Sequence, residues 1–189
     1  MRIDLTDPLA VMALTMAAEA RSDGAAGMGA VGCVIRNRAQ HPGWWGRDWL
    51  GVCLAPWQFS CWNPQTVGQP PDGNWRWMES ATLGDRDVAL AWNIARSIQA
   101  GLYPDVTGGA DSYYDVSLRH QPSWAAGARF CVQIGSQLFY RTRAADPAPP
   151  PLSSVAPALG SAGVPGAMGA ADALNAAELA SLGNPGTSA

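Results

Sequence analysis

Residues 7–22 read DPLAVMALTMAAEARS, and residues 25–40 read AAGMGAVGCVIRNRAQ. Asp7 and Pro8 are typical of the N-cap and the first position of a helix, so the first stretch predicts a helix from Pro8 to about Ser22. Its apolar residues recur at helical spacing and form one stripe: Leu9, Met12, Ala13, Met16 and Ala20. The second stretch repeats this spacing, and its small residues allow close packing between helices: Gly27, Gly29, Ala30 and Gly32. Two packed helices are therefore expected to form the centre of the fold.

The remaining elements are predicted around these two helices. Residues 43–80 are rich in Trp, Pro and Gly, have no sustained period, and are expected to form a long ordered loop of the kind that carries function. Asp85 or Asp87 is expected to cap a third helix that ends near residue 99. After a loop at 103–112, two strand-like runs flank Gly135-Ser136 and predict a two-residue β hairpin over 129–134 and 137–141. The expected fold class is mainly α (α+β), a helical domain with a small β hairpin.

Composition excludes two broad classes of protein. The chain has 189 residues, 14% charged residues and a net charge of -3, without the basic stripe expected of a nucleic-acid binder. No apolar run approaches the roughly 20 residues of a membrane span. The apolar stretch near the N-terminus imitates a signal peptide, but Asp4 and Asp7 make the segment before it acidic. We therefore expect no signal peptide, synthesis in the cytoplasm, and neither nucleic-acid binding nor membrane insertion.

The composition changes near residue 144. All Trp, Tyr and Phe residues lie at or before Tyr140, and residues 144–189 contain 14 Ala, seven Pro and six Gly but no Arg. Such a segment cannot bury enough apolar area to offset its ordering entropy. We therefore predict a folded domain over 1–143 and an extended Pro/Ala/Gly-rich tail or docking arm over 144–189, with a short helix at 170–182.

The four cysteines allow two interpretations. Cys53 and Cys61 are close enough in the sequence to bridge a loop, whereas Cys33 and Cys131 lie in apolar runs that predict buried free thiols. No C-x-x-C pair is present and only two His occur, so we expect no metal site and no cofactor.

Cys61 also suggests a thiol enzyme. The run Phe59-Ser60-Cys61-Trp62 resembles the surroundings of a papain-type nucleophile, with His120 as its base. A nucleophile of that class lies at a helix N-terminus, which lowers its pKa, whereas the Pro and Gly residues after Asn63 do not continue as a helix. A Cys-dependent amidase or peptidase stays an alternative.

Glu19 is the candidate acid. Glu occurs only at positions 19, 79 and 178, and Glu19 lies near the C-terminal end of the first predicted helix among apolar neighbours. Both the apolar surroundings and the helix dipole disfavour a carboxylate there. A carboxylic acid that keeps its proton is what glycosidic-bond cleavage needs as its general acid. The alternative is an exposed helix-end Glu paired with Arg21 or Arg36.

The stretch at 56–63, PWQFSCWN, is a candidate sugar-binding segment. Flat aromatic faces beside amide and hydroxyl groups suit a sugar, which offers C–H faces for stacking and hydroxyls for hydrogen bonding. The alternative is that its Trp62, together with Trp75 and Trp77, fills the core.

Seven separated motifs occur in order between residues 9 and 141. They are Ala18-Glu19-Ala20-Arg21, Gly27-Met28-x-Ala30-Val31, Val34-Ile35-Arg36-Asn37-Arg38, Val52-Cys53 to Gln58-Phe59-Ser60, Asp105-x-Thr107-x-Gly109-Ala110 to Tyr113-Tyr114, Trp124, and Ile134-Gly135 to Phe139-Tyr140. In this order they resemble the SleB-type cell wall hydrolase family, which includes the catalytic domain of spore cortex-lytic enzymes and many phage-encoded muralytic proteins.

The resemblance implies a lysozyme-like helical domain that cleaves the N-acetylmuramic acid–N-acetylglucosamine backbone of peptidoglycan, as a muramidase or a lytic transglycosylase. The family's single catalytic Glu falls on Glu19, as general acid and then base. In a transglycosylase the sugar's own 6-hydroxyl attacks, so no second carboxylate is required; Asp23, Asp105 and Asp111 are the candidates for one. Many relatives carry His where this chain has Tyr114 and Gln137, neither of which titrates near pH 7.

We therefore predict that Glu19 is catalytic and that six further residues hold the glycan strand: Gln58, Ser60, Trp62, Tyr113, Tyr114 and Gln137. The expected partner is the peptidoglycan glycan strand. Residues 144–189 are hypothesised to dock the enzyme onto phage tail or baseplate proteins, so that it acts on the cell wall from a virion. The non-enzymatic alternative is a catalytically inactive wall-binding component of a virion tail.

Overall fold

The computed structural model describes residues 3–63 and 73–143, all within one unit, Met1–Asp146. The predicted arm at 144–189 and the helix at 170–182 lie outside the described residues.

Helix α1 (Pro8–Ala20) begins as the sequence predicts. Asp7 Oδ1 accepts a hydrogen bond from Leu9 N at 2.9 Å, and Pro8 occupies the first helical position. The helix is buried continuously from Ala10 to Ala18, and the 3-10 turn η1 (Arg21–Asp23) follows it. The sequence predicted one apolar stripe on this helix, but residues on all its sides are buried between Ala10 and Ala18. A helix that is apolar all round is enclosed by its neighbours.

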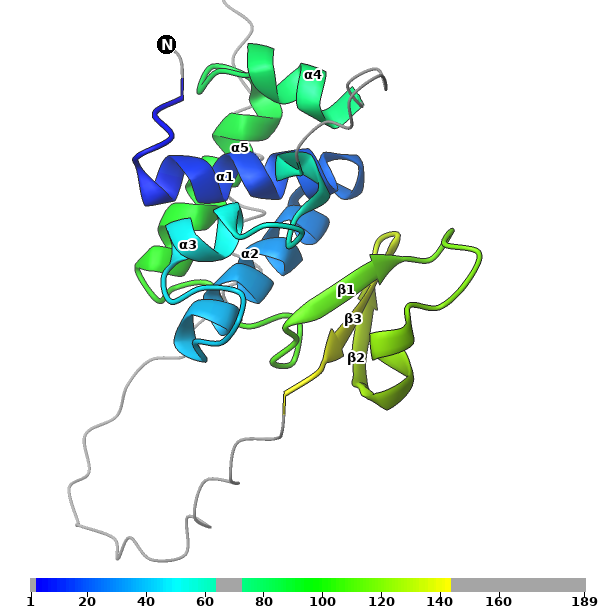
Figure 1. The fold of residues 1–189 in the computed structure, drawn as a ribbon. Coiled ribbons are helices and arrows are strands. Elements are labelled where there is room, and N and C mark those ends of the chain that lie inside the picture. The colour runs from blue at the N-terminus through cyan, green and yellow to red at the C-terminus, as the bar shows by residue number, and fades with distance from the viewer. Residues whose placement is uncertain (1–2, 64–72, 144–189) are drawn as a thin grey trace, which may run out of the picture. The chain divides into compact units, whose positions relative to one another are not determined.

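Helices α2 (Gly24–Gln40) and α5 (Arg86–Gln99) pack on α1 and on each other (Figure 1). Their buried side chains form most of the main core. Gly32 lies at this crossing. A Cβ there would come 2.6 Å from Ile98 Cδ1 and 3.1 Å from Met16 Cε. The prediction that small residues permit close helix packing is confirmed at this position.

The described part of this stretch, residues 43–63 and 73–80, contains three short elements that were not predicted: α3 (Trp49–Leu54), η2 (Ser60–Trp62) and α4 (Gly73–Ser80). Each is too short to show an apolar period. Asp48 caps α3 by accepting a hydrogen bond from Gly51 N at 2.7 Å, and the buried Trp45 donates its Nε1 hydrogen to Arg38 O at 3.1 Å. Local hydrogen bonds, such as those of Asp48 and Trp45, therefore position the short elements of this stretch.

The predicted hairpin is confirmed as β2 (Arg129–Ile134) and β3 (Gln137–Arg141), with Gly135 at φ 57° in the turn. A third strand, β1 (Ser112–Asp115), pairs with β3 and gives an antiparallel sheet of order β1-β3-β2. The expectation of a two-stranded hairpin was therefore incomplete. The short 3-10 helix η3 (Ser123–Gly127) lies in the connection from β1 to β2.

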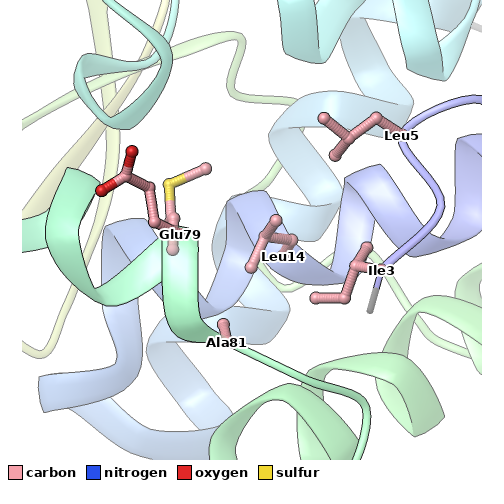
Figure 2. A pocket seen from close by; sticks show the side chains of 6 residues that line it. Ile3, Leu5, Leu14, Glu79 and Ala81 are labelled. Atoms are coloured by element: carbon pink, nitrogen blue, oxygen red, sulfur yellow. The ribbon is translucent and has the colours of Figure 1, made fainter. Parts of the chain in front are cut away.

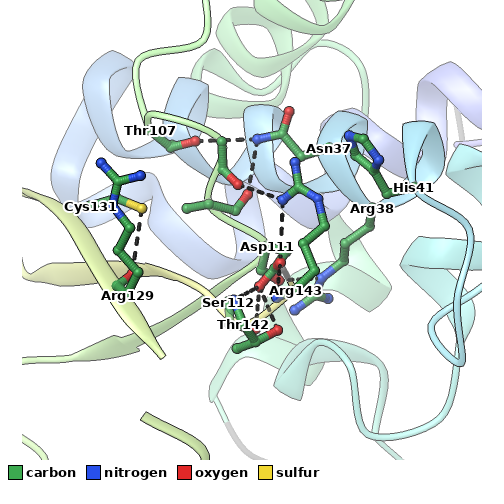
Figure 3. Close-up of polar contacts among 12 residues, drawn as sticks. Asn37, Arg38, His41, Thr107, Asp111, Ser112, Arg129, Cys131, Thr142 and Arg143 are labelled. Carbon is green, nitrogen blue, oxygen red and sulfur yellow. Dashed lines mark hydrogen bonds and ion pairs between the residues drawn. The ribbon is translucent and has the colours of Figure 1, made fainter. Parts of the chain in front are cut away.

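The sheet packs against α2 through a small second core of Ala30, Val34, Ala110 and Phe139. Polar contacts reinforce this junction (Figure 3). Asn37 Nδ2 donates to Ala110 O at 2.9 Å, and Arg38 Nε donates to Asp111 O at 2.6 Å. Helix α2 therefore fixes the position of the sheet.

All four cysteines are free, so the bridge between Cys53 and Cys61 is absent. Cys33 is buried as predicted, whereas Cys131, at a bulge in β2, is only partly buried. No helix in the described ranges is both long and apolar enough to cross a bilayer.

Candidate active site

Glu19 lies in the last turn of α1, and three groups from two distant parts of the chain donate hydrogen bonds to it. Ser60 Oγ and Cys61 N both donate to Oε1 at 3.0 Å, and Tyr113 Oη donates to Oε2 at 3.0 Å. The first two donors belong to η2 and the third to β1. The carboxyl group is therefore fixed between the helices and the sheet.

Each donor has a structural reason to be there. Cys61 is buried in the main core, which brings η2 against α1. The Tyr113 ring packs on Phe139 at a centroid distance of 5.4 Å and faces the helices. Burial, and then the charge of Glu19, raise the pKa of the Tyr113 hydroxyl well above its usual value, so this group stays protonated and able to donate.

Glu19 has no arginine partner among the described residues. Arg21 donates to Ala18 O at 3.1 Å and lies 4.5 Å above the Trp77 ring. Arg36 donates to Tyr103 O at 2.8 Å and pairs with Asp105 at 3.9 Å. The alternative in which Glu19 is a helix-end residue paired with Arg21 or Arg36 is therefore not the arrangement that the structure has.

A polar pocket of about 390 Å³ opens beside Glu19. Its other lining residues come from the end of α1, η1, α4 and the start of α5: Ala18, Arg21, Ser22, Asn74 and Asp87. Pockets of this size are in the range that takes small ligands. The Glu19 carboxyl group is therefore accessible from a cavity that offers hydroxyl, amide and charged groups.

The predicted sugar-binding residues of the 56–63 segment are only partly brought together. Ser60 contacts Glu19, as described above. Gln58 is half-buried, and its Nε2 donates to Pro56 O at 3.4 Å. Trp62 packs against the main core and donates its Nε1 hydrogen to Thr15 Oγ1 at 2.8 Å, so its contacts fit the core alternative better than a free stacking wall.

The sheet separates the other predicted residues. Tyr113 and Tyr114 are consecutive in β1 and therefore point to opposite faces. Tyr114 stacks on Tyr140 at 5.5 Å and contacts the Trp124 ring at 5.9 Å, in an aromatic cluster on the face away from Glu19. Gln137, on the same face as Tyr113, is buried, and its Oε1 has no hydrogen-bond partner in the described part of the chain.

The three candidate second carboxylates are all engaged elsewhere. Asp23 accepts hydrogen bonds from Ser136 N at 3.1 Å and Ser136 Oγ at 2.9 Å, at the hairpin turn. Asp105 accepts hydrogen bonds from Thr107 and Asn37. The fully buried Asp111 accepts hydrogen bonds from Thr142 N and Oγ1, both at 2.8 Å (Figure 3). These three carboxylates therefore have structural roles.

Sequence reasoning did not place Asn74 and Asp87 beside Glu19. Asn74 lies in a helix that was not predicted, and Asp87 was considered only as a helix cap. Trp57 belongs to the predicted 56–63 segment but was not among the predicted site residues. It is 72% exposed and adopts a positive φ of 66°, which is uncommon for a large side chain. Helix α4 has only eight residues, which is too short for an apolar period that would have predicted it.

The helical domain and its small antiparallel sheet make this an α+β protein. It has a candidate acid–base site, in which hydrogen bonds hold a glutamate beside a polar pocket. Residues 22–140 match the Cell Wall Hydrolase family, and the chain belongs to that family. Its substrate is accordingly the peptidoglycan of the cell wall. The match begins after Glu19 and contains Ser60, Cys61 and Tyr113. No curated protein and no solved structure matches this chain.

Within 3–63 and 73–143, no cluster of three or more His, Cys, Asp or Glu side chains could hold a metal ion.

Proposed function

We propose that this cell wall hydrolase cleaves the glycan strand of peptidoglycan between N-acetylmuramic acid and N-acetylglucosamine, with Glu19 as the general acid. The observation that carries the proposal is the set of three hydrogen bonds that Glu19 accepts at the edge of a polar pocket. The donors are Ser60 Oγ, Cys61 N and Tyr113 Oη. A general acid must be held within hydrogen-bond reach of the oxygen that it protonates, and this carboxyl group is held from both sides.

The hydrogen bonds also indicate which oxygen carries the acid proton. A backbone N–H can only donate, so Cys61 N requires Oε1 to remain an acceptor. Among the described residues, Oε2 contacts the hydroxyl of Tyr113 alone, and this hydroxyl can rotate to accept a hydrogen bond. We infer that the proton delivered to the leaving sugar oxygen resides on Oε2 and that Tyr113 orients it.

The thiol alternative has less support. Burial, and then the charge of Glu19, raise the pKa of the Cys61 thiol, which disfavours the thiolate that a nucleophile needs. Burial likewise raises the pKa of Cys53 to about 12. His120, the suggested base, is exposed and makes no hydrogen bond within the described ranges.

Mass spectrometry of the muropeptides released from purified sacculi tests the proposal. We expect wild-type protein to release glycan fragments, and Glu19→Gln to fold normally and lose activity by about 10² to 10⁴-fold, the usual contribution of general acid catalysis. Glu79→Gln is the matched control, because Glu79 is an exposed acid outside the Glu19 pocket.

Two outcomes would contradict the proposal. Free stem peptides as the product, together with loss of activity in iodoacetamide, would point to the Cys-dependent amidase. Binding of sacculi without release of any fragment would point to an inactive wall-binding component. Attachment to a phage tail through residues 144–189 stays a prediction that requires purified particles.

A further inference from the structure

Trp57 occupies a position in a turn that normally takes glycine. Gln58 N donates to Ala55 O at 3.2 Å and closes a four-residue turn, in which Pro56 and Trp57 are the two central residues. Proline followed by a residue with positive φ is the pattern of a type II turn, whose second central position favours Gly or Asn. Trp57 has φ 66°, and among the described residues it is the one non-glycine with a positive φ. A residue with a Cβ loses free energy in this conformation.

The exposure of Trp57 is a second cost to the fold. Its side chain is 72% exposed, so the indole gains little of the free energy that apolar burial supplies. Trp62, later in the same segment, packs against the main core. It also lines an apolar pocket together with three residues that are labelled in Figure 2: Leu5, Leu14 and Glu79. Packing therefore explains Trp62 but does not explain Trp57.

The turn lies in the segment that contacts Glu19. It connects α3 to η2, and both of these elements pack on α1, the helix that carries Glu19. Phe59, directly after the turn, is buried in the main core. Ser60, which donates to Glu19, is exposed, and the chain between Trp57 and Ser60 lets their Cα atoms lie at most about 11 Å apart. The exposed indole is therefore held within short reach of the residue that contacts the candidate acid.

We propose that Trp57 is a substrate-binding residue, whose indole face stacks on a sugar ring of the glycan strand close to the bond that is cleaved. The inference rests on the proposed function of Glu19. The strand is a polymer, so its sugar residues continue along the protein surface beyond that bond. A sugar ring presents C–H faces that suit a flat aromatic side chain. The closed turn and the buried Phe59 hold the segment in place before the strand binds, which reduces the ordering cost of binding.

Glycan strands freed of their stem peptides are the probe that tests this inference. Trp57→Gly removes the indole and places a favoured residue in the turn, so we expect a melting temperature no lower than that of wild type. Its KM for these strands should be about 10-fold higher, as for loss of an aromatic anchor, with kcat close to wild type. In the Glu19→Gln background, which prevents cleavage, the same substitution should raise the Kd for the strands by a similar factor. Trp57→Tyr keeps a flat ring and should retain most of the affinity.

Trp44→Ala is the matched control. Trp44 is 78% exposed and contacts the Trp45 ring at a centroid distance of 5.5 Å, outside the segment that contacts Glu19. We expect this variant to keep the KM and the Kd of its parent protein.

The outcomes separate the two proposals. Unchanged KM and Kd in Trp57→Gly, or an equal increase in Trp44→Ala, would overturn the role of Trp57 and leave that of Glu19 intact. A lower melting temperature in Trp57→Gly, or a loss of kcat at constant KM, would also overturn it, because the residue would then serve the fold or the chemical step. Wild-type protein that leaves peptide-free strands unbound and uncleaved, and releases stem peptides from sacculi, would instead overturn the proposed function itself.

Discussion

At the scale of single residues, the site depends on which atoms face Glu19. Ser60 and the Cys61 amide hold one oxygen of its carboxyl group, and Tyr113 meets the other. Tyr114, next in the chain, bonds instead to the Tyr140 hydroxyl at 3.3 Å. The alternation of side chains along one strand thus gives two adjacent tyrosines different roles.

Tyr113→Phe should therefore reduce glycan cleavage with little change in stability. Phe keeps the packing on Phe139 and removes only the hydroxyl at Glu19. A hydrogen bond between neutral groups contributes about 0.5–1.5 kcal/mol, so we expect an activity loss of roughly 2- to 10-fold in a sacculus turbidity assay. Tyr114→Phe provides the comparison, and we expect it to retain most activity. Equal losses in both variants would show that the tyrosines act through the sheet as a whole.

At the scale of elements, two contacts hold the sheet against the helices near the site. The Asp23 carboxylate binds the hairpin turn at Ser136, and α2 holds the opposite end of the sheet through Asn37 and Arg38. Asp23 follows Glu19 by only four residues. The same short segment thus positions the candidate acid and the turn of the sheet that supplies Tyr113.

Gly135→Ala should weaken this contact. Gly135 has φ 57°, a conformation that costs a residue with a Cβ about 1 kcal/mol, and the added Cβ would collide with the Asp23 side chain. We expect a lower melting temperature and lower activity. Gly101→Ala is a matched control, because Gly101 also has a positive φ, 71°, but nothing lies within 4 Å of its Cβ position. If Gly135→Ala lowered the melting temperature no more than Gly101→Ala does, the close contact between Gly135 and Asp23 would contribute nothing to the stability of the fold.

Asp105, in the loop that joins α5 to the sheet, should make the stability of the folded state depend on pH. Burial raises the pKa of Asp105, but hydrogen bonds from Thr107, Asn37 and Gly109 outweigh it and leave the pKa below its usual value. A carboxylate with a lowered pKa stabilises the folded state above its unfolded pKa of about 3.9, and this stabilisation is lost as pH falls through the folded pKa. Asp105→Asn should thus be less stable than wild type at pH 7 in urea unfolding, and the difference should shrink below about pH 4. A constant difference at all pH values would exclude this origin.

At the scale of the whole molecule, every described contact of the site lies within the unit Met1–Asp146. The last described residue, Arg143, closes this unit through an ion pair with Asp111 at 3.4 Å. The family match also ends before it, at residue 140. The interactions described above for the candidate site therefore all come from residues that precede Asp146.

A chain that ends at Asp146 should keep the melting temperature and the sacculus-degrading activity of the full chain. Ending the chain before Thr142 should instead destabilise it, because Asp111 would lose partners while fully buried. Thermal unfolding and turbidity assays of the two truncated chains check this. Loss of activity on removal of 147–189 alone would assign that segment a part in catalysis.

The sequence by itself determined the long elements and the candidate acid. The helices at 8–20 and 24–40 and the hairpin follow from period, caps and a glycine turn, which are local and need no knowledge of neighbours. The order of motifs indicated the cell wall hydrolase family, to which the chain belongs. Glu19 stood out because glutamate is scarce and this one follows an apolar run.

Only the tertiary structure decided what surrounds Glu19. Tyr113 is 94 positions away in the chain and Ser60 is 41 positions away, and no periodic pattern encodes contacts across such distances. The structure also shows that Trp62 packs against the core and that Asp87 lines the pocket of Glu19. Asp23, Asp105 and Asp111 accept hydrogen bonds where different elements meet. The physical reason is that Asp23, Asp105 and Asp111 accept hydrogen bonds from backbone and side-chain donors of distant elements, and only the packing of those elements sets where the donors lie.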